Sequence, residues 1–172
     1  MDEANISTIE TLDEPGAAFA NGKFLSFRLS QEEYGIAILK VREIIGMVDV
    51  TALPRTPDFV LGVVNLRGRI IPVIDLRRKF GMESAEFTNE TCIVVVDVGK
   101  DADSAFRVGC IVDSVSEVMT IGTESFEPPP RCANAVGDYI AGLVKLKDRV
   151  LILLDIERVI GDIDPEALGA TA

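Results

Sequence analysis

Short runs of β-branched and aromatic residues, separated by glycine, asparagine or charged residues, recur along most of this chain. Such runs predict β-strands, because branched and aromatic side chains fit the pleated surface of a sheet and the polar breaks supply the turns. The breaks at 31–33 and 66–69 are spaced as hairpin turns. In the first half the predicted strands are Phe24–Leu29, Tyr34–Ile38, Val60–Asn65 and Ile70–Ile74. In the second half they are Thr91–Val98, Phe106–Val112, Gly142–Leu146 and Arg149–Leu154.

Three segments have helical features instead. The apolar spacing within Leu39–Ile45 predicts a short helix. Asp75 and Asp155 each precede about six helix-compatible residues that end at a glycine, which is the pattern of a helix N-cap followed by a glycine stop. The predicted structure is therefore mainly β with a few short helices.

An internal repeat explains why these patterns recur. Residues 34–45 align with 108–119, and residues 60–81 align with 140–161 without a gap. Seven of the 22 positions in the longer alignment are identical: Gly62/Gly142, Val64/Val144, Leu66/Leu146, Arg69/Arg149, Asp75/Asp155, Arg78/Arg158 and Gly81/Gly161. Most other aligned positions exchange one aliphatic residue for another, so the two copies are expected to have one fold.

Each copy supplies about five short strands in about 65 residues, and closure into a barrel protects strand edges better than an open sheet does. We therefore expect two five-stranded β-barrels. The expected division is a first barrel over 23–90 and a second over 91–161, flanked by flexible acidic tails at 1–22 and 162–172. The tails hold eight of the 28 acidic residues and none of the 17 basic ones.

Charge and composition narrow the possible functions. The net charge of −11 argues against nucleic acid and anionic lipid as partners. No apolar run approaches the length of a membrane span, and the first residues are acidic where a signal peptide needs Lys or Arg. The expected location is the cytoplasm, without insertion into the membrane.

The residue types also limit the chemistry. There is no histidine, which removes His-based catalytic triads and His-ligated metal sites. Cys92, Cys110 and Cys132 form no Cys-x-x-Cys pair and are expected to be free thiols. No phosphate-binding or dinucleotide-binding glycine motif occurs. The sequence thus predicts no catalytic residue, no metal site and no cofactor.

The repeat helps to separate structural residues from candidate functional ones. Asp75 and Asp155 could form the carboxylate pair of a hydrolase, but each has the same capping position in its own copy, which favours a structural role. The hairpin tip differs between copies, since Asn65-Leu-Arg-Gly68 stands opposite Lys145-Leu-Lys-Asp148. Arg67 can therefore serve a partner through its planar donors, or it can be a solvated turn arginine.

The motifs NLRGRIIPVIDLRRKFG, EEYGIAILKVREI, VGCIVDSVSEV and YIAGLVKLKDRVLILLDIERVI resemble the bacterial chemotaxis coupling family, CheW. The resemblance runs from about residue 23 to 161. It implies two SH3-like β-barrels and a non-enzymatic adaptor that couples methyl-accepting chemotaxis receptors to the histidine kinase CheA. In this family the receptor tip, an antiparallel helical hairpin, docks in a groove between the barrels, and the regulatory domain of the kinase meets the exposed barrel ends and builds rings. The expected location is then at receptor arrays on the inner face of the membrane.

The same resemblance implies a receptor-binding set, carried over by motif. Its members are Val41 and Glu43 in the short helix, Gly62, and Asn65, Arg67 and Gly68 at the hairpin tip. Glu43 agrees with its repeat partner Glu117, so a surface charge on the helix is the alternative interpretation. Ala37 departs from the family, which often has an acid there. No kinase-binding residue is assigned, and flanks of 22 and 11 residues leave no room for a kinase or receiver domain.

Overall fold

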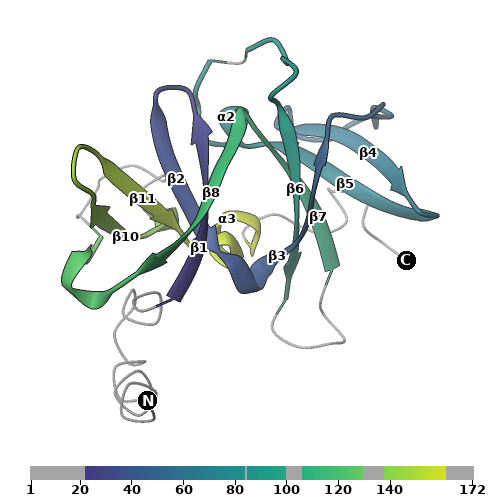
Figure 1. The fold of residues 1–172 in the computed structure, drawn as a ribbon. Coiled ribbons are helices and arrows are strands. Elements are labelled where there is room, and N and C mark those ends of the chain that lie inside the picture. The colour runs from purple at the N-terminus through teal and green to yellow at the C-terminus, as the bar shows by residue number, and fades with distance from the viewer. Residues whose placement is uncertain (1–21, 84, 100–105, 130–137, 162–172) are drawn as a thin grey trace.

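The computed structural model describes residues 22–83, 85–99, 106–129 and 138–161, and it is mainly β, as predicted. Figure 1 shows two sheets side by side with one short helix, α3 (Ile156–Gly161), between them. The expected tails, other than Gly22, and Cys132 lie outside the described residues. Cys92 and Cys110 are free thiols, and Cys110 is buried.

The two sheets contain six and five strands. Sheet A has the order β8-β1-β2-β11-β10-β9, made of Ser114–Ile121, Gly22–Leu29, Glu32–Ala37, Val150–Leu154, Ile140–Lys145 and Phe126–Glu127. Sheet B has the order β3-β6-β7-β5-β4, made of Val41–Gly46, Cys92–Val98, Phe106–Val112, Arg69–Asp75 and Val60–Leu66. In both sheets neighbouring strands are antiparallel except for β2 with β11 and β5 with β7.

The sheets do not divide the chain at residues 90 and 91, so the division expected from the repeat is wrong. The hairpin β1–β2 comes from the first copy but pairs with β8 and β11 of the second, and β6–β7 pairs with β3 and β5 of the first. The reason is that the chain changes sheet directly after each hairpin. Between β2 and β3 it passes through the 3-10 helix η2 (Ile38–Lys40), and between β7 and β8 through Asp113 alone.

The edge strands of each sheet are joined to each other along the chain. In sheet B a bridge between Thr51 and Val63 ties the segment that follows β3 to β4, the opposite edge. In sheet A the 3-10 helix η3 (Thr123–Ser125) connects β8 to β9 at the other edge. In each sheet the two edge strands are thus consecutive along the chain, and one connection runs from one edge to the other.

The largest core cluster draws on both sheets. It contains Phe27 and Ile36 from sheet A, Val94 and Val108 from sheet B, and Phe80 at the end of α2 (Leu76–Lys79). Two smaller clusters lie within sheet A and within sheet B. Alternate residues of a strand face opposite sides of a sheet. A strand that is buried on both sides therefore contributes one face to the shared cluster and the other face to the cluster within its own sheet.

The helix expected over Leu39–Ile45 is limited to η2, and Val41 begins a strand instead. β3 pairs with β6 from Val41 to Gly46 and alternates half-buried with exposed residues along its length. Its β-branched residues suit a strand, and hydrogen bonding to β6 decides the outcome. The predicted N-caps are confirmed, since the Asp75 carboxylate accepts the Arg77 N–H at 3.0 Å.

Candidate functional site

The hairpin tip between β4 and β5 is a tight turn built by Asn65, Arg67 and Gly68. Arg67 and Gly68 both have positive φ angles, 52° and 86°, as a two-residue turn between twisted strands requires. The Asn65 side-chain oxygen accepts the Gly68 N–H at 2.9 Å, which closes the turn. The identities of Asn65 and Gly68 are thus explained by the turn, and they fix the place from which the Arg67 side chain extends.

Arg67 does not stand free in solvent. Its two terminal nitrogens donate to the two carboxylate oxygens of Glu43 at 2.8 Å each, a bidentate ion pair. The Arg67 side chain is 76% exposed and that of Glu43 is 24% exposed. The hydrogen bond from Arg67 holds the pKa of Glu43 below its ordinary value. The pair therefore presents a fixed arrangement of charges where the hairpin tip meets β3.

Gly62 and Val41 are placed differently from these four residues. Gly62 is buried at a register shift in β4 with φ 148°, and a Cβ there would overlap the carbonyl oxygen of Thr51. Its role in the structure is to let the segment after β3 approach β4. Val41 is half-buried and packs against the core shared by both sheets. The structure thus brings Glu43, Asn65, Arg67 and Gly68 to one surface, and it gives Val41 and Gly62 packing roles away from that surface.

Two exposed apolar residues on β3 and β5 were missed by the sequence analysis. Ile44 follows Glu43 on β3 and is 41% exposed, and Ile70 pairs with Asn65 across the hairpin and is 58% exposed. The alternation along β3, which the helical prediction concealed, could have indicated the exposure of Ile44. The equivalent residues of the second copy, Val118 and Val150, are also exposed.

The corresponding tip of sheet A has different bonding. Arg149, the repeat partner of Arg69, donates to the buried carboxylate of Glu33 and to Asp148. It lies 3.9 Å from Glu117, which is the repeat partner of Glu43. The equivalent acids Glu43 and Glu117 are therefore paired with arginines at different positions of the repeat. This difference supports the inference that the Glu43–Arg67 arrangement is particular to sheet B.

Asp75 and Asp155 act as helix caps in the structure. The Asp155 carboxylate accepts the N–H of Glu157 at 3.1 Å, in the way that Asp75 caps α2. Each also pairs with the arginine three residues later, Arg78 at 3.8 Å and Arg158 at 3.5 Å. Burial raises the pKa of Asp75 above its ordinary value. These bonds use the carboxylates locally and leave nothing that favours a hydrolase.

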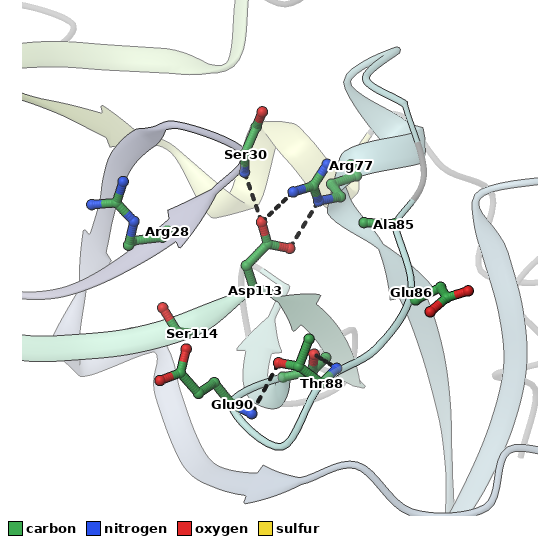
Figure 2. Close-up of a pocket in the computed structure, with 10 residues that line it drawn as sticks. Arg28, Ser30, Arg77, Ala85, Glu86, Thr88, Glu90, Asp113 and Ser114 are labelled. Carbon is green, nitrogen blue, oxygen red and sulfur yellow. Dashed lines mark hydrogen bonds and ion pairs between the residues drawn. The ribbon is translucent and has the colours of Figure 1, made fainter.

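A polar cavity of about 260 Å³ lies where β7 crosses to β8, and it is shown in Figure 2. Arg28, Arg77, Glu86, Glu90 and Asp113 are among the residues that line it. The described residues contain no group of three or more cysteine, aspartate or glutamate side chains arranged to hold a metal ion. Within the same residues, no helix has the length and apolar character needed to cross a membrane.

Comparison with known proteins places this chain in a family. The model of the CheW-like domain matches residues 23–164. The chain is 44% identical over 139 residues to the chemotaxis protein CheW of Klebsiella aerogenes, which covers 80% of this chain and 81% of that protein. It is 33% identical over 138 residues to the chemotaxis protein CheW of Helicobacter pylori, with the same two shares covered.

A solved structure agrees with these relatives. The crystal structure of the scaffolding protein TtCheW from Thermoanaerobacter tengcongensis is similar to this chain with a TM-score of 0.73 and 34% sequence identity. The similarity covers 81% of this chain and 92% of that one. Sequence and structure therefore point to the same family.

Proposed function

The chain belongs to the CheW-like domain family, and on this premise we propose how its surface serves the coupling of receptors to a kinase. It is a non-enzymatic scaffold of chemotaxis signalling, whose partners in general are chemotaxis receptors and the histidine kinase CheA. The finer proposal concerns the receptor. The cytoplasmic tip of a receptor docks against the surface formed by Glu43, Asn65, Arg67 and Gly68, which we name the tip cluster.

The observation that carries this proposal is the bidentate bond between Arg67 and Glu43, with exposed Ile70 paired with Asn65 in the same hairpin. A helical hairpin with apolar and polar faces needs both kinds of contact, apolar residues for burial and fixed charges for register. The ion pair holds Arg67 in one orientation, so less side-chain entropy is lost on docking. Val41 contributes by packing β3 against the core, and Gly62 by letting the segment after β3 approach β4.

The proposal also covers the kinase and the location. The regulatory domain of the kinase binds away from the tip cluster, at the exposed ends of the sheets, and no residue is assigned to that contact. Simultaneous binding of both partners then locates the protein in the cytoplasm, at receptor arrays on the inner face of the membrane.

Arg67→Glu tests the receptor surface. The change places two carboxylates together at the tip, so we expect receptor binding to weaken tenfold or more while kinase binding changes less than twofold. Titration against a receptor hairpin fragment and against the kinase regulatory domain measures both. The matched control is Lys147→Glu, the same reversal at the equivalent tip of sheet A, which should leave receptor binding within twofold.

A charge exchange separates the fold of the tip from its recognition. Arg67→Glu combined with Glu43→Arg restores an ion pair of reversed direction, and we expect it to recover thermal stability without recovering receptor binding. Full recovery of binding would mean that the pair only shapes the tip. Equal loss of receptor binding in Arg67→Glu and Lys147→Glu would reduce the effect to overall charge and contradict the proposal.

A further inference from the structure

An ion pair joins the crossover between β7 and β8 to the helix α2. The guanidinium of Arg77 donates through Nε to one carboxylate oxygen of Asp113 at 2.8 Å and through a terminal nitrogen to the other. The N–H of Ser30, in the turn between β1 and β2, donates to the same carboxylate at 2.7 Å. Figure 2 shows Asp113 held between these two donors beside the polar cavity. We name Ser30, Arg77 and Asp113 the α2 clamp.

A second set of contacts joins the crossover between β2 and β3 to α3. The Lys40 ammonium pairs with one carboxylate oxygen of Glu157, and the N–H of Gly99 donates to the other at 3.1 Å. Gly99 directly follows β6, the first strand of the other hairpin. We name Lys40, Gly99 and Glu157 the α3 clamp. In both clamps a crossover, a helix and a hairpin turn meet at one carboxylate.

The two clamps are equivalent in position and opposite in polarity. Arg77 and Glu157 align in the repeat, each two residues after a capping aspartate. Lys40 and Asp113 lie at crossover positions that differ by one residue in the alignment. In the α2 clamp the helix carries the base and the crossover the acid; in the α3 clamp the helix carries the acid and the crossover the base.

This inversion matters because the repeat allows a second arrangement of strands. In the structure Val73 pairs with Gly109 and Leu153 pairs with Gly35, and these are equivalent pairs in the repeat. If each copy kept its own hairpin, β5 would lie beside β2, and β11 beside β7. Arg77 would then face Lys40, and Glu157 would face Asp113.

Backbone hydrogen bonds would be much the same in the two arrangements, because the strand pairings are equivalent in the repeat. Apolar packing would differ, because β1–β2 carries Phe24, Phe27 and Tyr34 where the aligned positions of β6–β7 have Cys92, Val95 and Val108. The four charges differ: both contacts are attractive when hairpins are exchanged and both are repulsive when they are not. Specificity is a difference between two free energies, and repulsion in the unwanted state contributes to it as much as attraction in the native one.

We propose that the charges of Lys40, Arg77, Asp113 and Glu157 select the exchanged arrangement of the two hairpins over the arrangement in which each copy keeps its own. They are specificity-determining residues of the fold, and they position β3, which starts at the residue after Lys40 and carries Glu43.

Thermal unfolding of three full-length variants tests the coupling between the charges. One variant has Arg77→Glu with Glu157→Arg, another has Lys40→Glu with Asp113→Lys, and the third has all four changes. Net charge is the same in all. Each double variant makes both clamps like-charged, and we expect its Tm to fall by about 5 °C or more. The quadruple variant restores opposite charges, so its Tm should exceed that of either double variant although it has lost the carboxylates that accept from Ser30 and Gly99.

Disulfide trapping during refolding tests which arrangement forms. With the three native cysteines replaced by alanine, Lys23→Cys with Thr120→Cys reports the exchanged arrangement, because these residues pair between β1 and β8. Gly46 is the repeat equivalent of Thr120 and has open space around its Cα, so Lys23→Cys with Gly46→Cys reports the alternative. The share of the 23–46 link should rise in both double variants and return to the native level in the quadruple variant.

The outcomes decide the proposal in both directions. A quadruple variant no more stable than the weaker double variant would overturn it, because the charges would then act separately. An unchanged share of the 23–46 link in the double variants would also overturn it, since another feature would then select the arrangement. Exchanging the exposed pair Glu127 and Lys145, 2.8 Å apart within sheet A, is the matched control and should change neither measurement.

Discussion

At the scale of single residues, two glycines near the tip cluster illustrate two different requirements. Gly68 has a positive φ in a turn with open space around it, so the turn geometry alone favours glycine. Gly62 has a positive φ and also lies against the backbone of Thr51, so it is required by both conformation and space. The sequence identified both as candidates for receptor binding, and the structure separates their roles.

Gly62→Ala is expected to destabilise the protein more than Gly68→Ala. A non-glycine residue in a sparsely populated region of φ/ψ costs about 1–3 kcal/mol, and at Gly62 the added Cβ also displaces the bridge between Thr51 and Val63. Urea unfolding curves measure the difference, which should change the midpoint and leave the m-value alone. Equal midpoints for the two variants would show that the segment after β3 moves away without cost.

Two aspartates are expected to affect stability with opposite dependence on pH. Burial raises the pKa of Asp113, but the hydrogen bonds from Arg77 and from the Ser30 N–H outweigh it, so that the net pKa is lowered. Its contribution is therefore present above the ordinary aspartate pKa and lost as pH falls through the lower folded value. Burial leaves the pKa of Asp75 raised, so its contribution is full at low pH and lost as pH rises through the folded pKa.

Asp113→Asn should lower Tm at pH 7, and the difference from the unsubstituted protein should shrink as the pH approaches 3. Asp75→Asn keeps a capping side chain and should compare more favourably at pH 7 than at low pH. Scanning calorimetry between pH 3 and pH 7 measures both trends. Parallel trends for the two variants would contradict the opposite pKa shifts.

At the scale of elements, the strands with continuous apolar runs could be predicted from the sequence, but β3 and β8 could not. In β3 the apolar residues at 41, 44 and 45 fit a helical spacing, and Ile44 is exposed where a strand prediction expects a polar residue. β8 mixes polar and apolar residues without strict alternation and has little burial. Both are edge strands with one neighbour, so pairing with β6 and β1, which is remote in sequence, determines their structure.

Phe80 joins several elements, and its truncation tests how strongly they depend on each other. It ends α2, is buried, and has ring contacts with Tyr34 of β2 at 6.2 Å and with Tyr139, just before β10, at 5.8 Å. Phe80→Ala should lower the free energy of unfolding by about 3–5 kcal/mol. Phe80→Leu fills much of the space and should cost less than half as much. Chemical denaturation checks both, and a small effect of alanine would place the ring outside the shared core.

At the scale of the whole molecule, the sequence predicts two similar units, one in each copy of the repeat. The structure has two sheets, and each of them combines strands from both copies. The repeat predicts five strands in each unit, where the structure has six in sheet A and five in sheet B, and similar local patterns contain no information on which hairpin joins which sheet. That choice rests on side chains at the crossovers, Lys40 and Asp113 among them. For the tip cluster the motif predicted Arg67 and Glu43 separately, and their bond was not predicted, because it joins edges distant in sequence.

Fragments 22–90 and 91–161 test the corrected division. Each fragment lacks the hairpin that pairs with its remaining strands, three strands in 22–90 and four in 91–161, and its own hairpin would bring like charges together, so each alone should give the circular dichroism of a largely unfolded chain. Mixed in equal amounts, they should recover β structure and sharp thermal unfolding. A fragment as stable alone as in the mixture would show that a copy completes itself with its own hairpin at no cost, contrary to the proposed selection.

The exchange of hairpins has a consequence for how the protein assembles. A single ancestral copy of about 65 residues could complete its sheet in this way only by donating its hairpin to a second chain, which is the geometry of a symmetric, swapped homodimer. Joining two copies in one polypeptide turns that bimolecular encounter into an internal one, with the partner always present at high effective concentration. Folding then no longer depends on how much protein the cell makes, and each copy is free to change its surface, as the two hairpin tips have done.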